Sequence, residues 1–253
     1  MARLDRLGSA KEVAQIGAAI GREFSYSLLA AVAAKPEVEL QSALDRLGRA
    51  GLLFRQGVPP HATYLFKHAL VQDAAYGTLS RNQRQYLHSR IAATIEQNFP
   101  EMTANQPGLL AQHYAKAGLN EPALTFWTIA GDLAERRAMS REAVAHYRAA
   151  CALVSSSELS VASRASEPRL FMKLGNALQQ AEGYSSTSAL EAYENARVAA
   201  RKLDQLEDYA NASIGVGPLL FGGCRYQQVL KIARELTSDY LERLGPLTRS
   251  VFW

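Results

Sequence analysis

The side chains that could do chemistry in this 253-residue chain are few and scattered. His88, His113 and His146 each stand alone in a helical pattern, with no second histidine at metal-ligand spacing and no carboxylate cluster close by. Cys151 lies in an apolar helix end, where a small core residue is expected, and Cys224 has no histidine near it in sequence. Because an active site needs several such groups together, the sequence predicts no catalysis by this chain.

Sequence patterns that mark reactive or phosphate-binding loops are missing as well. The chain has neither a G-x-S-x-G nucleophile elbow nor a G-x-x-x-x-G-K-[ST] loop that could cradle phosphates. Its two cysteines are too few for a disulfide framework or a four-cysteine zinc site. We therefore expect the chain itself to bind no metal and no cofactor.

The composition is typical of a soluble globular protein, with 48% apolar and 21% charged residues. No apolar run approaches the ~20 residues that a membrane span needs, and the first residues do not resemble a secretory signal. Two cysteines suit a reducing compartment, so we expect a cytoplasmic location without membrane contact. The net charge of +4 is too small by itself to indicate a nucleic-acid partner.

Helical patterns fill the first 50 residues. Ser9 and Glu12 form a capping-box pattern at the start of the first helix, and Ser25 can cap the second. Pro36 suits the first turn of a third helix, because its missing N–H would have no partner there. Gly51 stands where that helix needs a left-handed C-terminal residue.

Strand signals are confined to one region after these helices. Two strand-like runs, at 52–55 and 63–66, are joined by a turn rich in glycine and proline. The chain as a whole is thus predicted to be mostly α. Three helices followed by a short β-hairpin predict a winged helix-turn-helix over residues 1–66.

The charge of the third helix decides whether this unit should bind DNA. Its outward face carries Glu37, Glu39, Gln41, Ser42, Asp45, Arg46 and Arg49. A recognition helix normally brings net positive charge to the phosphates, and this face has three acids and two bases. We therefore expect a packing module that does not bind nucleic acid. A winged-helix transcriptional regulator, with the rest of the chain as its sensor, is the alternative.

Residues 67–106 form a predicted helical connector. Leu70 and Leu79 are expected to face inward in its first helix. A second capping box begins at Ser80, and Pro100 ends the helix that follows.

A recurring pattern dominates the rest of the chain, residues 107–253. A small residue is followed by an aromatic residue four positions later and by an alanine three positions after that. The copies are Ala123, Trp127 and Ala130; Ala143, Tyr147 and Ala150; Ala189, Tyr193 and Ala196; with a weaker form at Val229, Ala233 and Leu236. A small turn residue precedes each copy: Gly118, Ala138, Gly183 and Gly223.

This pattern is typical of antiparallel helix hairpins of the tetratricopeptide (TPR) type, because small residues let two helices approach while the aromatic ring fills the wedge beside them. The spacing is irregular, and the first two copies are expected to share one helix. We expect the first TPR-like helices at 107–154, a serine-rich hinge at 155–166 and further repeats at 167–253. The array ends at Val-Phe-Trp without a polar capping helix, which predicts a fragment of a longer protein.

Four stretches carry a resemblance to a known family. They read ARLDRL at 2–7, AQIGAAIGREF at 14–24, LDRL with AGLL between 44 and 53, and YLFKHALVQDAAY at 64–76. Together they resemble the winged-helix and TPR region of bacterial STAND-type (signal-transducing) ATPases, many of which are linked to class III adenylate or guanylate cyclase domains. The resemblance extends to about residue 154 and is only repeat-like beyond.

The resemblance implies a regulatory role beside a domain that binds ATP or ADP upstream in the parent protein. In related switch ATPases a winged-helix histidine touches the phosphates of bound ADP and holds the inactive state, and His68 lies at a comparable place. Judged from the residues alone, a histidine at this strand-to-helix junction also fits a capping or core position. The parent protein would be the ATPase or nucleotide cyclase.

The expected function is therefore that of a non-catalytic regulatory and protein-interaction module. The winged helix would pack on the upstream ATPase domain of the same chain, and the helical array would offer a surface to a protein partner or ligand. The candidate partner-binding residues are Gln112, Arg136, Arg137, Arg141, Arg148, Lys173, Arg197, Arg201 and Lys202. Solvated helix faces would explain the same residues.

Overall fold

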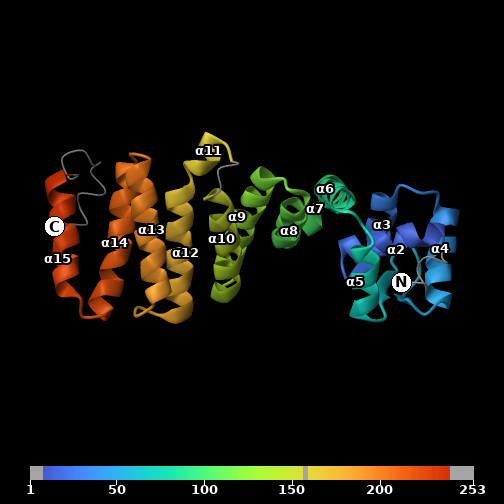
Figure 1. The fold of residues 1–253 in the computed structure, drawn as a ribbon. Helices are drawn as coiled ribbons and strands as arrows, with labels where there is room; N and C mark the ends of the chain where they lie inside the picture. The colour runs from blue at the N-terminus through green and yellow to red at the C-terminus, as the bar shows by residue number, and fades with distance from the viewer. Residues whose placement is uncertain (1–7, 156–158, 240–253) are drawn as a thin grey trace. The chain divides into compact units, whose positions relative to one another are not determined.

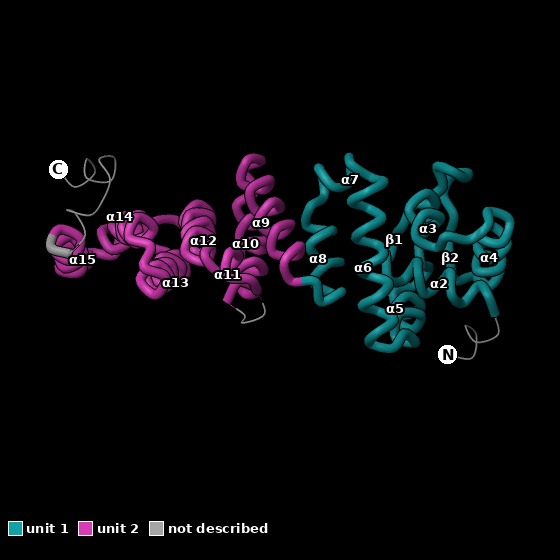
Figure 2. The backbone as a smooth tube through the Cα atoms, turned by 90° about the horizontal axis from the view of Figure 1, so that it is seen from above, with its two compact units in different colours: residues 1–119 teal, residues 120–253 magenta. Residues whose placement is uncertain are grey.

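The computed structural model describes residues 8–155 and 159–239. The chain is mostly helical, with one small antiparallel sheet (Figure 1). It divides into two compact units, Met1–Leu119 and Asn120–Trp253 (Figure 2). Residues 1–66, the predicted connector at 67–106 and the start of the predicted TPR-like region all fall within the first unit.

The described part of unit 1 begins with three helices and a sheet. The helices are α2 (Ser9–Ile20), α3 (Tyr26–Ala33) and α4 (Glu37–Arg49), and the strands are β1 (Glu23–Ser25), β2 (Leu53–Gln56) and β3 (Thr63–Phe66). The strand order is β1-β3-β2, and both pairings are antiparallel. The predicted hairpin of β2 and β3 is confirmed.

The expectation that strands occur only in the hairpin is wrong, because β1 adds a third strand. Three residues are too few to show an alternating pattern, so tertiary pairing decides their conformation. Phe24 lies opposite Tyr64 in the register, and its ring stacks on Tyr64 at 5.9 Å between centroids. Gly17 of α2 lets that ring approach, since a Cβ there would lie 2.7 Å from Phe24.

Three capping signals were predicted for helices α2, α3 and α4 of this unit, and two of them occur in the structure. Ser25 caps α3 by accepting a hydrogen bond from the Leu28 amide, and Gly51 adopts a left-handed φ of 69° after α4, both as predicted. The predicted capping box at Ser9 is wrong, because Gly8 is the N-cap residue and no side chain caps α2. One residue of shift at a frayed helix start is enough to abolish the box.

The rest of unit 1 is helical: α5 (Ala69–Gly77), α6 (Arg81–Asn98), α7 (Pro100–Asn105) and α8 (Pro107–Ala117). The capping box of Ser80 and Gln83 starts α6, and Pro100 separates α6 from α7, as predicted. Leu79 is buried. The expectation for Leu70 is wrong, because its side chain is 80% exposed.

Unit 2 is built of helices only in its described part. They are α9 (Asn120–Arg136), α10 (Ser140–Val154), α11 (Val161–Arg164), α12 (Glu167–Glu182), α13 (Thr187–Lys202), α14 (Leu206–Gly222) and α15 (Tyr226–Asp239). Ala138 and Gly183 adopt left-handed conformations between successive helices, as the turn pattern predicts. Before α15 the positive φ falls on Cys224 instead of Gly223. The prediction that the first two copies share a helix is wrong, because the turn at Ala138 separates α9 from α10.

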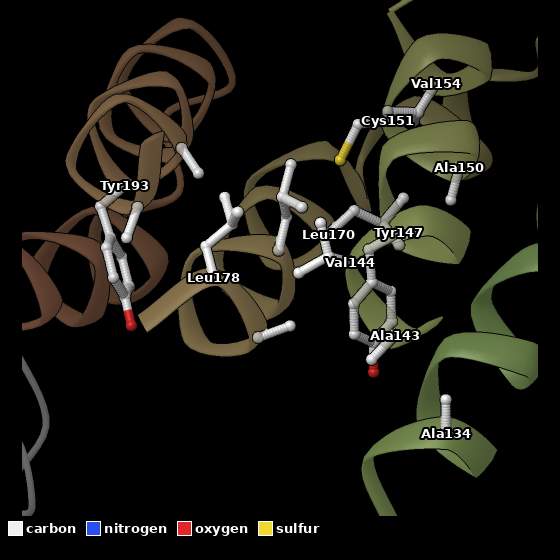
Figure 3. Packing of buried hydrophobic residues seen from close by; sticks show 14 of the residues in the cluster. Ala134, Ala143, Val144, Tyr147, Ala150, Cys151, Val154, Leu170, Leu178 and Tyr193 are labelled. Atoms are coloured by element: carbon white, nitrogen blue, oxygen red, sulfur yellow. The ribbon is translucent and has the colours of Figure 1, made fainter. Parts of the chain in front are cut away.

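Tyr147 and Tyr193 belong to the buried apolar cluster at the core of unit 2 (Figure 3). Tyr147 packs on Gly131 of α9 so closely that a Cβ there would overlap the ring. Tyr193 of α13 lies between Gly175 of α12 and Gly215 of α14, and a Cβ at either position would collide with it. These three glycines therefore allow the helices to approach the tyrosine rings closely.

The serine-rich segment 155–166 does not separate two cores. One cluster of buried side chains extends from Leu124 of α9 to Leu220 of α14 and includes Leu159 within that segment. Glu121 of α9 also accepts hydrogen bonds from the Ser160 amide and the Ser163 hydroxyl, which fixes the start of α11. The predictions for residues 2–7 and 246–253 lie outside the described residues. Among the described helices, none has both the length and the apolar character that a membrane crossing requires.

Candidate functional site

His68 stands on the surface where the chain leaves β3 and enters α5. Its backbone is extended, with φ −134° and ψ 140°, and its carbonyl accepts a hydrogen bond from the Val71 amide. The imidazole itself makes no capping hydrogen bond, and the residue is exposed. A core or side-chain capping role, which the residues alone left open, therefore does not account for this histidine.

Lys67 and Leu70, its neighbours along the chain, are exposed as well. The Lys67 ammonium lies over the half-exposed Phe54 ring, 5.3 Å from its centroid, and Leu70 projects from the first turn of α5. We call Phe54, Lys67, His68 and Leu70 the His68 surface. The ammonium of Lys67 suits an anionic group, and the exposed apolar side chains suit a protein partner.

Five of the predicted partner-binding residues are exposed on helices α8, α9 and α10 or directly after them. Gln112 lies on α8, Arg136 and Arg137 at the end of α9, and Arg141 and Arg148 on α10; all are exposed. Exposure keeps them available to a partner, and it equally fits solvated helix faces.

The other predicted residues fall into two places in unit 2. Arg197, Arg201 and Lys202 line one cavity of about 350 Å³ on α13, together with Glu194 and Tyr209. The guanidinium of Arg197 donates to both Glu194 oxygens at 3.0 and 2.8 Å, and to the Tyr209 hydroxyl at 2.9 Å. Arg201 donates to the same hydroxyl at 2.8 Å.

Arg197 also connects three helices. Its Nε donates to Ser213 of α14 at 2.9 Å, and its Nη2 donates to Glu235 of α15 at 3.2 Å. These contacts engage its donors inside the chain, so Arg197 acts first as a structural connection.

Lys173 of α12 is engaged in the same way. Its ammonium contacts Asp132 of α9 and lies 5.8 Å from the centre of the Tyr147 ring. The Tyr147 hydroxyl donates to Asp132 at 2.6 Å and to Glu135 at 2.9 Å. Burial, followed by these two carboxylates, raises the pKa of Tyr147 well above its ordinary value.

The outward face of α4 is the surface that a DNA-binding winged helix would use. This face is largely exposed, and its charges are mixed. Asp45 lies 4.0 Å from Arg55 of β2, and Gln41 donates to Glu37 one turn earlier. This arrangement provides no positive footprint for phosphates.

The prediction that His88 and His113 stand alone is wrong. Both are buried, and their Nδ1 atoms lie 2.9 Å apart, so one ring donates and the other accepts. The Tyr76 hydroxyl lies 2.8 Å from His88 Nε2, on the other side of that ring. His113 Nε2 is buried without a hydrogen-bond partner among the described residues. The sequence carries no signal for this cluster, because the histidines are 25 positions apart and meet only where α6 packs on α8.

Burial keeps both imidazoles neutral. Desolvation, followed by the charge of Lys116, lowers the pKa of His88 to about 4. Desolvation likewise lowers the pKa of His113 to about 3, with His88 and Lys116 adding to the effect. A neutral histidine pair can transfer a proton, or it can stabilise the fold through its hydrogen bond. The pair carries no positive charge near neutral pH.

The remaining reactive side chains do not converge. His146 stacks on Trp127 and lies 3.5 Å from Glu142. Burial raises the pKa of Cys151 to about 12, which leaves its thiol protonated and unreactive, whereas Cys224 is exposed. Within residues 8–155 and 159–239, no three His, Cys, Asp or Glu side chains gather where they could hold a metal ion.

Comparisons with known proteins place few limits on the function. The chain matches no family model. An uncharacterized protein of Rhizobium meliloti (strain 1021) is 34% identical over 204 residues, which cover 79% of this chain and 20% of that protein. The chain thus spans about a fifth of the length of that relative. The crystal structure of BtubC (BKLC) from P. vanneervenii aligns over 96% of this chain and 94% of that one, at 11% identity and a TM-score of 0.32, which is too low to establish a shared fold.

Proposed function

We propose that this chain is a non-catalytic regulatory and protein-interaction module of a multidomain signalling ATPase or nucleotide cyclase. Unit 1 would hold a winged helix that couples to a nucleotide-binding domain of the same parent chain. Unit 2 would be a TPR-like array that senses a protein partner or ligand. The resemblance in the sequence motivates this assignment, and the geometry of the His68 surface supports it best.

Exposure of His68 is the observation on which the proposal depends. An imidazole that neither caps a helix nor fills a core is available to an outside group, and this one stands beside Lys67 and the exposed Leu70. A protonated imidazole can donate to a phosphate oxygen, and an adjacent leucine and phenylalanine can pack against a partner domain. One surface can therefore join a nucleotide and the domain that binds it.

The arrangement of elements supports both halves of the proposal. Helices α2, α3 and α4 precede the hairpin of β2 and β3, which is the order of a winged helix. In unit 2, helix pairs pack through glycine and tyrosine, which suits a repeat array that presents a broad surface. A ligand that prefers one arrangement of the parent protein would shift its equilibrium by that difference in affinity.

Replacement of His68 in the full-length parent protein tests the proposal. We expect His68→Ala to weaken retention of bound ADP by about tenfold, since one charge-assisted hydrogen bond to phosphate is lost. The measurement is the dissociation rate of a fluorescent ADP analogue from the purified parent protein.

The matched control is His61→Ala, which removes an exposed histidine in the turn between β2 and β3. This variant should retain ADP like the wild type. Unchanged retention in His68→Ala, or an equal loss in both variants, contradicts the assignment of His68.

A further inference from the structure

A basic cavity in unit 1 is lined by none of the residues of the His68 surface and by none of the predicted partner-binding residues. Its volume is about 440 Å³, within the range of small-molecule sites. Its lining includes Tyr76 of α5, three residues near the start of α6, and Lys116 of α8. The α6 residues are Arg81, Arg84 and Gln85. No carboxylate lines it, so the lining carries three positive charges and no negative one.

Within the described part of the chain, no counter-charge lies at ion-pair distance from these three cations. Among the described residues, neither Arg81, Arg84 nor Lys116 takes part in an ion pair. A positive cluster without counter-charge raises the free energy of the fold by mutual repulsion, and an anion would relieve that repulsion.

Arg84 is held in place at the wall of this cavity. Its guanidinium lies 4.7 Å from the centre of the Tyr76 ring, and its Nη2 donates to the Gly77 carbonyl at 3.3 Å. Its Nε is buried and has no hydrogen-bond partner within the described part of the chain. A guanidinium fixed on an aromatic face retains donors for a planar or tetrahedral oxyanion.

The electrostatic surroundings of the cavity also favour an anion. Lys116 lowers the pKa of both buried histidines, and Arg84 adds to the effect on His88. The cavity also borders the first turn of α6, an 18-residue helix whose dipole places positive potential at that end. Gly118, at a φ of 77°, leaves room for the Gln85 amide, since a Cβ there would lie 3.3 Å from its nitrogen.

We propose that this cavity is a binding site for a small phosphorylated ligand, held by Arg81, Arg84 and Lys116. The two arginines supply forked donors for phosphate oxygens, Lys116 supplies a point charge, and Gln85 supplies a neutral hydrogen bond. The volume exceeds that of one phosphate, so the cavity fits a diphosphate or a phosphate ester. This ligand is separate from the nucleotide proposed to meet His68, and the two sites can be tested independently.

Titration of the full 253-residue chain with inorganic pyrophosphate, followed by calorimetry at low ionic strength, tests the proposal. We expect one saturable site per chain. Lys116→Gln, at an exposed position that should not disturb folding, is expected to weaken binding by about tenfold, and Lys116→Arg to restore most of it. Pyrophosphate should also shift the ring resonances of His88, because Tyr76 in the cavity wall contacts that ring.

The charge-matched control is Arg22→Gln, which removes an exposed cation of unit 1 outside the cavity. Its affinity for pyrophosphate should equal that of the wild type. Absence of saturation, or equal weakening in Arg22→Gln and Lys116→Gln, overturns the proposal. Binding of a phosphoserine peptide at this site more tightly than pyrophosphate also overturns it, because the ligand would then be a phosphorylated protein.

Discussion

The buried histidine pair of unit 1 couples stability to pH at the scale of single residues. Each ring is neutral in the folded chain, and the contact between the two Nδ1 atoms requires one protonated and one bare nitrogen. Protonation of either ring would place a charge in a desolvated site, and protonation of the accepting ring at Nδ1 would leave two donors facing each other. Unfolding exposes both rings to water, where they bind protons at an ordinary pKa of about 6.5.

Acid should therefore destabilise unit 1. The folded-state pKa values lie below the unfolded value, so the unfolded state binds more protons from about pH 6.5 down to about 4 at His88 and about 3 at His113. The stability is complete above pH 6.5 and falls as pH decreases, by at most about 1.4 kcal/mol per pH unit for each histidine. Urea unfolding of unit 1 between pH 7.5 and 4.5 measures this slope.

A double variant separates this effect from general acid sensitivity. His88→Leu with His113→Leu should flatten the slope, because neither position can then bind a proton. His61→Gln, which removes an exposed histidine, should leave the slope unchanged. A slope that is equal in all three proteins would show that other groups cause the acid sensitivity.

At the scale of helices, unit 2 depends on the absence of Cβ atoms at a few positions. Tyr193 is enclosed by Gly175 on one side and Gly215 on the other, so its ring cannot move away from an added methyl group. Gly48, near the end of α4 in unit 1, has no atom within 4 Å of the position its Cβ would occupy. The same substitution should therefore have opposite effects at the two sites.

Gly215→Ala should destabilise unit 2 by about 1–3 kcal/mol through overpacking against Tyr193. Gly48→Ala should instead stabilise α4 by about 0.5–1 kcal/mol, because alanine is the better helix former and no atom outside the helix obstructs it. Chemical denaturation followed by circular dichroism measures both. Equal effects of the two substitutions would show that the ring of Tyr193 does not constrain the helix spacing.

At the scale of the whole molecule, the two units each possess the buried apolar residues that a fold requires. Unit 1 buries Phe24, Phe66 and Ile91, and unit 2 buries Tyr147 and Leu178. Separate cores predict separate stability.

Residues 1–119 and 120–253, produced as separate chains, should each unfold cooperatively. The acid dependence should be stronger in the first fragment, since both buried histidines belong to it. Far-ultraviolet circular dichroism against urea concentration checks this expectation. A fragment that is unfolded in buffer would show that its core is completed by the other unit.

Helical content, most helix ends and the hairpin could be predicted because they depend on residues close in sequence. Ser80 with Gln83, Pro100 and Gly183 act within one or two turns of the backbone, so the pattern of neighbours specifies them. Predictions of which way a side chain faces were weaker. Leu70 carries an apolar side chain at a helical position expected to be buried, yet no element of the described chain covers it.

The amino-acid sequence by itself determined that the chain is mostly helical, where its turns lie, and that glycine and alanine recur where helices approach. Only tertiary packing decided that β1 joins the sheet, that His68 is exposed, and that His88 meets His113. It also gathered Arg81, Arg84 and Lys116 around one cavity. These features depend on contacts between residues that are far apart along the chain. The spacing of neighbouring residues carries no information about such contacts.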